Sequence, residues 1–335
     1  MVQETPNGEL MRRHFLAGAA CLAGLTPYGV TAQTVTPPDP GPLPNVAADS
    51  DVASVTAGRN VSQHLTIKVM INGGGPYDFV VDTGAELTVL ADNVAAQLNL
   101  PAGAPITVEG VTGRIQTRLV PVGELRVGPF RHENMKLPIL PRSFLQADGF
   151  LGLDVIGESR VTFDFSAKAL KIERPRMRFE PNGLNATRIR TSGVGGRLRA
   201  TNCFVDNVRA SAFIDTGAEL SVGNPALEAA LRKRRRGVTV LGPAILRDIT
   251  GTQVNGEVIA IREIALQSLQ FTSGSLVIAD VPSFDTFDLR NEPAMLIGMD
   301  FLRQFASVSI DYRLKEIRFE LAEMTPPAPI RIQRG

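Results

Sequence analysis

The chain has 335 residues, which is enough for two hydrophobic cores of ordinary size. Its 35 Lys and Arg against 34 Asp and Glu leave a net charge of +1, which excludes a strongly basic nucleic-acid binder and an acidic solvating tail as the main role. Apolar residues make up 44% and charged residues 21%, a globular composition. Tryptophan is absent, so aromatic platforms for sugars or single-stranded bases are not expected.

The amino-terminal residues have the order of an export signal. Arg12-Arg13 precede an apolar run from Phe15 to Leu25, and the small residues Val30-Thr31-Ala32 follow it. At 11 residues the run is too short to span a bilayer and is typical of a signal-peptide core. We therefore expect a leader over residues 1–32. The alternative is an amphipathic first helix of the folded domain.

The leader predicts a periplasmic or secreted protein with no stable membrane anchor after its removal. Arg-Arg-His-Phe-Leu resembles a twin-arginine signal, although Met11 stands where those signals usually carry Ser or Thr. Cleavage before Gln33 would leave Cys203 as the only thiol, so no internal disulfide is expected.

After the leader, short strand-like segments fill most of the chain. A proline-rich linker is expected over 33–59, a first lobe over 60–174, a second linker over 175–191, a second lobe over 192–322 and an exposed tail over 323–335. Residues 64–71 alternate apolar and polar side chains as a strand does, and residues 91–100 are the one helix expected in the first lobe. In the second lobe, Asn224 followed by Pro225 predicts the start of a helix.

The second lobe repeats the first. Residues 82–87 and 215–220 both read Asp-Thr-Gly-Ala-Glu-Leu. Three looser blocks recur in the same order, and the offset between the copies grows from 133 to 147 residues along the chain. Four blocks in one order indicate a duplicated domain with small insertions in the second copy.

Each Asp-Thr-Gly-Ala follows an apolar strand. A block of two apolar residues and a glycine comes later in each copy: Gly152 lies 70 residues after Asp82, and Gly298 lies 83 residues after Asp215. A strand end, an acid and a glycine together place a carboxylate on a tight, partly buried loop. This pattern, present once per copy, resembles the aspartic proteases and specifically their retroviral-protease, or retropepsin-like, branch. The resemblance implies an all-β fold with two tandem β-barrel lobes that form a single-chain pseudo-dimer.

The resemblance also implies the chemistry. Asp82 and Asp215 would form a catalytic pair that shares one proton and activates a water for peptide hydrolysis, with neither metal nor cofactor. Thr83, Gly84 and Ala85, with their counterparts Thr216, Gly217 and Ala218, would support the two loops. Ala85 and Ala218 replace a hydroxyl usual in pepsin-like enzymes, which favours an activity optimum less acidic than pepsin's.

Two glycine-containing turns match the hairpins that close over substrate in that family, which we call flaps. The first flap carries Val111, Thr112 and Gly113, and the second carries Ile249, Thr250 and Gly251.

Other titratable residues fit structural roles better. Asp154, Asp164, Asp300 and Asp311 are expected to cap helices or turns, and Glu86 and Glu219 to bind backbone or the neighbouring lobe. The three histidines, His14, His64 and His132, lack metal-ligand spacing.

The expected partner is a peptide or protein substrate, and no nucleic acid. Two alternatives stay open. The chain could be an inactive periplasmic protein that binds peptides in the same fold, and each copy could pair with its twin in a homodimer instead of within one monomer.

Overall fold

The computed structural model describes residues 16–17, 52–56, 58–59, 64–174, 186–194, 197–234 and 237–321. The expected tail over 323–335 and nearly all of the expected leader over 1–32, with its cleavage site, lie outside these residues. The same is true of the proline-rich part of the 33–59 linker and of residues 175–185 of the second linker.

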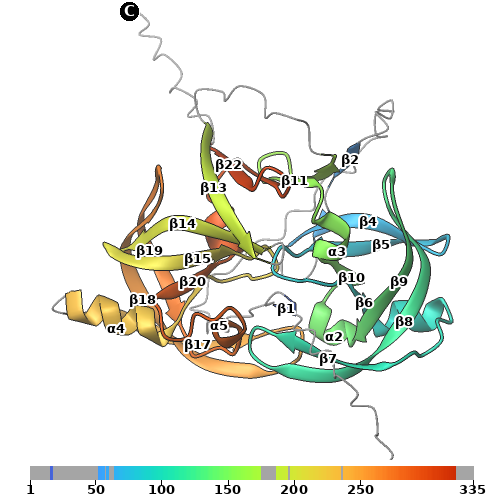
Figure 1. The fold of residues 1–335 in the computed structure, drawn as a ribbon, viewed down its shortest axis with the longest axis horizontal. Coiled ribbons are helices and arrows are strands. Elements are labelled where there is room, and N and C mark those ends of the chain that lie inside the picture. The colour runs from blue at the N-terminus through green and yellow to red at the C-terminus, as the bar shows by residue number, and fades with distance from the viewer. Residues whose placement is uncertain are drawn as a thin grey trace, which may run out of the picture.

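The first lobe is a closed six-stranded barrel, drawn in blue and green in Figure 1. Its strands follow the order β8-β9-β6-β10-β5-β4, and pairing of β8 with β4 closes the ring. Their bounds are β4 Leu65–Ile71, β5 Gly74–Val81, β6 Val89–Ala91, β8 Arg114–Val127, β9 Phe130–Leu140 and β10 Gly149–Leu151. Three short helices accompany them, α1 Asp92–Gln97, α2 Arg142–Leu145 and α3 Leu153–Ile156.

The second lobe repeats this barrel with the order β18-β19-β16-β20-β15-β14, closed by pairing of β18 with β14. Its strands are β14 Arg197–Val205, β15 Val208–Ile214, β16 Val222–Gly223, β18 Gln253–Leu266, β19 Leu269–Ile278 and β20 Ala294–Ile297. Its helices are α4 Pro225–Arg234, α5 Ser283–Thr286 and α6 Met299–Leu302. The all-β, two-lobed fold expected from the sequence is therefore confirmed.

A sheet shared by both lobes joins the two barrels. Its order is β13-β22-β21-β11-β12-β2, with bounds β2 Val52–Thr56, β11 Arg160–Asp164, β12 Ala169–Glu173, β13 Ala186–Val194, β21 Ser307–Asp311 and β22 Glu316–Glu320. At its centre, β11 of the first copy pairs antiparallel with β21 of the second, so that Val161 faces Ile310 and Thr162 faces Ser309. These strands are one of the repeated sequence blocks, and their pairing marks a pseudo-two-fold axis. Within the two expected linkers, β2 adds an edge strand to this sheet, and residues 186–191 belong to β13.

A hairpin extends from each barrel on the side opposite the shared sheet (Figure 1). In the first lobe β7 (Pro105–Gly110) pairs with β8, and in the second β17 (Val240–Arg247) pairs with β18. Two minor strands complete the topology: β1 (Leu16–Ala17) pairs in parallel with β7, and β3 (Gly58–Arg59) pairs with β4.

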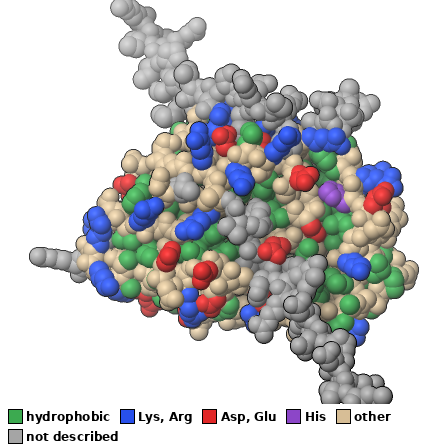
Figure 2. All heavy atoms as spheres, in the orientation of Figure 1, with side chains coloured by type: hydrophobic (Ala, Val, Ile, Leu, Met, Phe, Trp, Pro, Cys, Tyr) green, Lys and Arg blue, Asp and Glu red, His purple; other side chains and the backbone are tan. Residues whose placement is uncertain are grey.

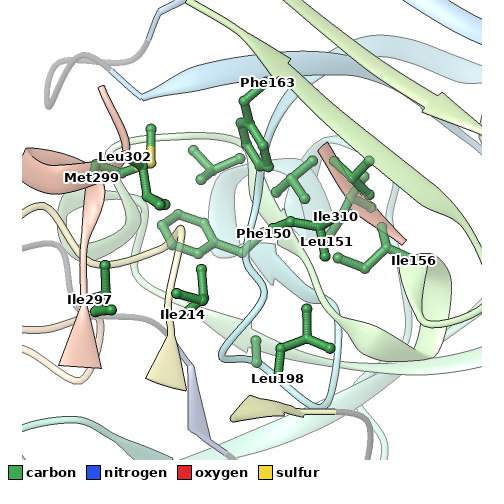
Figure 3. Packing of buried hydrophobic residues seen from close by; sticks show 14 of the residues in the cluster. Phe150, Leu151, Ile156, Phe163, Leu198, Ile214, Ile297, Met299, Leu302 and Ile310 are labelled. Carbon is green, nitrogen blue, oxygen red and sulfur yellow. The ribbon is translucent and has the colours of Figure 1, made fainter. Parts of the chain in front are cut away.

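Both lobes contribute to one hydrophobic core. Figure 3 shows Phe150 of the first lobe between Leu151 and Phe163 of its own lobe and Ile214, Ile297, Met299 and Leu302 of the second. Burial of side chains this large stabilises a fold by about 1.5–3 kcal/mol each. The repeated loops therefore rest on a common apolar base, which fixes their mutual position.

Local sequence signals explain the helices. Asn224 accepts a hydrogen bond from the Leu227 N–H at 2.8 Å, so it caps α4 as predicted. The helix expected over residues 91–100 is the shorter α1, because Asn99 adopts a left-handed backbone conformation with φ of 51°.

On the face drawn in Figure 2, acidic and basic side chains are interspersed, in keeping with the balanced charge of the sequence. Within the described ranges, no helix combines the length and apolar character needed to cross a membrane.

Candidate active site

The two Asp-Thr-Gly loops leave their barrels at equivalent points. β5 and β10 run parallel, and the Asp82 N–H donates to the Leu151 carbonyl at 3.0 Å where both strands end. β15 and β20 repeat the arrangement, with the Asp215 N–H donating to the Ile297 carbonyl at 2.9 Å. Each carboxylate is thus fixed by a strand pair inside its barrel rather than by a free loop.

Reciprocal hydrogen bonds of two threonines join the loops. The Thr83 hydroxyl donates to the Ile214 carbonyl at 2.9 Å and accepts from the Thr216 N–H at 3.0 Å. The Thr216 hydroxyl donates to the Val81 carbonyl at 2.8 Å and accepts from the Thr83 N–H at 3.1 Å. All four bonds are buried and all four cross between the lobes, so they hold the two loops in a fixed mutual position.

The structure brings Asp82 and Asp215 together. Both are buried, with exposed fractions of 0% and 4%, and a side-chain hydrogen bond links their carboxyl groups. The glycines permit this approach. A Cβ on Gly84 would lie 2.9 Å from Asp215 Cγ, and one on Gly217 would lie 2.6 Å from Asp82 Cγ. Any side chain at these two positions would push the opposite carboxylate away.

Burial raises the pKa of Asp215 well above its usual range, and the negative charge of Asp82 raises it further. Hydrogen bonds from the backbone of Gly217 and Ala218 oppose these effects by stabilising the ionised form. Two carboxyls this close cannot both carry a charge without a large penalty, so the arrangement favours one shared proton.

Ala85 and Ala218 complete the loops through their backbones. The Ala85 N–H donates to Asp82 Oδ1 at 3.1 Å, beside the bond that Gly84 donates at 2.8 Å. The carbonyls of Ala85 and Ala218 accept from Leu153 and Met299 at the start of α3 and α6. Their methyl groups are buried and offer the carboxylates no donor beyond the backbone.

The expected flap residues lie at the tips of the two hairpins. In the first, the Gly110 N–H donates to the Gly113 carbonyl at 2.7 Å across Val111 and Thr112. In the second, the Gly251 N–H closes the turn on the Asp248 carbonyl at 3.0 Å. The tips meet, because the Thr112 hydroxyl lies 2.8 Å from that of Thr252 in the other lobe.

Two repeated acids do more than was predicted. Asp154 and Asp300 were predicted to cap helices or turns, and they do lie in the first turn of α3 and α6, where Asp300 accepts from the Phe301 N–H at 2.9 Å. Each also binds the loop of its own lobe. Asp154 Oδ1 accepts from the backbone and the hydroxyl of Thr88 at 2.9 and 2.7 Å, and that hydroxyl accepts from the Gly152 N–H. Ser221 makes the same contacts in the second lobe.

The Ser221 hydroxyl donates to Asp300 at 2.6 Å and accepts from the Gly298 N–H at 2.9 Å. Sequence reasoning missed both hydroxyl groups, although each stands one residue after the six-letter repeat. For the other two repeated acids the turn-capping prediction is confirmed: Asp164 accepts from the Ala167 N–H at 2.7 Å and Asp311 from the Leu314 N–H at 2.8 Å.

Glu219 connects the lobes, as expected. It forms a two-pronged ion pair with Arg303 of its own lobe and lies 3.6 Å from His64 Nε2 of the first lobe. His64 is 1% exposed, and burial lowers its pKa to about 4, against an opposing effect of Glu219. Among the described residues, no three His, Cys, Asp or Glu side chains lie together so as to hold a metal ion.

One further titratable group lies close to the loops. Burial raises the pKa of Tyr312 well above its usual range, and the charges of Asp82 and Asp215 raise it further. Tyr312 follows β21 of the shared sheet, so this sheet lies behind the two loops.

Two closed six-stranded barrels that meet at paired Asp-Thr-Gly loops define the aspartic protease fold. The family model for aspartyl proteases matches residues 67–155 and 201–301, one region in each lobe. These regions cover more than half of the chain, which therefore belongs to the aspartyl protease family, with a retropepsin-like domain in two tandem copies. No curated protein matches the chain.

Proposed function

We propose that this protein is an aspartic endopeptidase whose catalytic pair is Asp82 with Asp215. The observation that carries the proposal is the hydrogen-bonded, buried pair of carboxyls, one from each lobe, at the centre of the molecule. Membership of the aspartyl protease family supports it. The proposed substrate is a peptide or protein, and the proposed location is the periplasm or the exterior, as the leader predicts.

The reaction follows from one proton shared by two acids. The ionised carboxylate accepts a proton from a water, and the water oxygen attacks the scissile carbonyl carbon. The protonated carboxyl donates its proton to the carbonyl oxygen, which gives a neutral gem-diol. Collapse of the gem-diol breaks the C–N bond, and a proton passes to the leaving amine. The pair titrates as a unit, so the general base and the general acid are not assigned to particular residues.

The surroundings suit this chemistry. The threonine cross-link holds both carboxyls in place before substrate arrives, so little reorganisation is needed in the transition state. The raised pKa of Asp215 keeps a proton on the pair at a pH where an exposed carboxyl has lost it. Ala85 and Ala218 add no hydroxyl donor that would lower it, which supports an activity optimum less acidic than pH 2.

The test is cleavage of a peptide library by the purified chain between pH 3 and pH 8. Asp82→Asn and Asp215→Asn, each alone, should abolish cleavage while the circular dichroism spectrum stays unchanged. Asp164→Asn is the matched control, because Asp164 is another repeated acid but caps a turn of the shared sheet. Binding of peptides without cleavage by the unmodified chain would overturn the enzyme proposal and favour a peptide-binding protein.

A further inference from the structure

The two flap tips are similar in sequence, but they differ in kind at the residue that precedes the repeated block. Val111-Thr112-Gly113 matches Ile249-Thr250-Gly251, but the residue before each block is Gly110 in the first flap and Asp248 in the second. The Asp248 side chain is 1% exposed although it stands at the tip of a hairpin. A buried carboxylate at a hairpin tip requires partners, and the partners come from both flaps.

The two oxygens of this carboxylate serve different flaps. Oδ1 holds its own turn, because it accepts from the Thr250 N–H at 2.9 Å and from the Thr250 hydroxyl. Oδ2 accepts from the Thr112 N–H of the first flap at 2.8 Å. One charged group thus orders its own turn and binds the tip of the opposite lobe with a charge-assisted bond, which is the stronger kind.

The first flap has the space to receive this carboxylate. A Cβ on Gly110 would lie 2.0 Å from Asp248 Oδ2 and 2.7 Å from Thr250 Cγ2, so a larger residue cannot occupy this position while the tips touch. The difference between the copies is therefore complementary: one flap contributes the carboxylate and the other leaves room for it.

Apolar contacts place the first tip in the same closed position. Val111 is buried in a hydrophobic cluster whose other core members, from Ala218 to Leu296, belong to the second lobe. Its carbonyl also accepts from the Ser283 N–H of α5 at 3.4 Å. On the other side, a Cβ on Gly251 would lie 2.6 Å from the Phe144 ring of the first lobe, so each tip packs on the opposite barrel.

We propose that Asp248 is a positioning residue that latches the two flaps together in the free protein. It acts through the flaps and not on the reacting atoms. Separation of the tips must break the bond from the Thr112 N–H to Asp248 and the contacts of the Thr112 hydroxyl with Thr252, and it must withdraw Val111 from the second lobe. The contact between the flaps does not depend on the proposed function. Only its consequence does, namely that a peptide substrate enters the site when the latch opens.

The direct test is hydrogen exchange of the Thr112 backbone amide in the full chain, because this amide is the donor that the latch holds. Asp248→Ala should raise its exchange rate about tenfold to a hundredfold, the range expected when a hydrogen bond to a charged group is lost. Asp280→Ala is the control, since Asp280 is exposed, pairs with Arg290 and should leave the rate unchanged. An unchanged rate in Asp248→Ala would overturn the latch.

A second variant tests whether the space at Gly110 receives the Asp248 carboxylate, and it leaves the charge of the flaps unchanged. Gly110→Ala should separate the tips by collision with the carboxylate and should also raise exchange at Thr112. In the Asp248→Ala background the same added methyl should have a smaller effect, because the carboxylate oxygen is gone. Equal effects in the two backgrounds would show that Gly110 does not receive Asp248, and would overturn the proposed fit.

Peptide kinetics then separate the latch from the enzyme proposal. Asp248→Ala should speed peptide association by a factor similar to the gain in exchange, while kcat changes less. Faster exchange with unchanged association would refute the gating role of the latch. An unmodified chain that cleaves nothing, yet shows latch-dependent exchange, would refute the endopeptidase and leave the latch standing.

Discussion

His64 makes the stability of this protein sensitive to acid. Its side chain is buried where the two lobes meet, 3.6 Å from Glu219, and its pKa is about 4 compared with 6.5 in an unfolded chain. The difference corresponds to about 3 kcal/mol of free energy of unfolding. His64 is nearly inaccessible to solvent, so water and salt screen this effect little.

The direction in which stability changes with pH follows from the number of protons that each state binds. Below pH 6.5 the unfolded chain binds a proton at His64, whereas the folded chain does so only near pH 4. The unfolded state therefore binds more protons in this interval, and stability falls as the pH falls. The contribution is fully present above pH 6.5 and is lost by about pH 4.

Urea unfolding of the full chain at intervals between pH 7.5 and pH 4 measures this effect. His64→Gln removes the titrating group, so the variant should lose about 3 kcal/mol less stability than the unmodified chain over that interval. His132→Gln is the comparison: burial also lowers the pKa of His132, but this residue on β9 is only half-buried, so the variant, which retains His64, should keep most of the pH dependence. Parallel pH dependences of the unmodified chain and His64→Gln would refute the reasoning.

Two further substitutions test what holds the lobes together. Thr216→Val leaves the Thr83 N–H and the Val81 carbonyl buried without that hydroxyl, so it should lower the free energy of unfolding by about 2–4 kcal/mol in urea, while Thr216→Ser keeps the hydroxyl and most of the stability. Equal stability of the Val and Ser variants would contradict the cross-link. Arg160→Leu removes the guanidinium that donates twice to Asp311 across the shared sheet and also pairs with Glu173, so it should cost about 3–5 kcal/mol by thermal or urea unfolding. Unchanged stability of this variant would contradict the role of the buried ion pair.

Repetition in the sequence accounts for what could be predicted of the fold and the site. An identical loop in two copies, each after an apolar strand, predicts two equivalent carboxylates, and their meeting requires only that the copies pack symmetrically. The buried hydrogen-bonded pair of Asp82 and Asp215 has the geometry this argument implies.

The parts that escaped prediction depend on contacts between distant residues that no local pattern marks. Thr88 and Asp154 are 66 residues apart in the sequence. The hydroxyl residue is Thr in the first copy and Ser in the second, so the identical six-residue repeat ends one residue before it. Asp248 escaped notice because it departs from the repeat. Its partner across the lobes, Thr112, becomes visible only when the two hairpins are folded against each other.

The mismatch between Gly110 and Asp248 has a consequence for how such a molecule can evolve. Two identical subunits related by an exact symmetry axis would set glycine against glycine, with nothing to bind, or aspartate against aspartate, with two repelling anions. Fusion of the halves into one polypeptide removes that constraint, since each half then mutates alone. Complementary pairs of unlike residues then become accessible next to the axis as well, where identical subunits set each residue against its own copy.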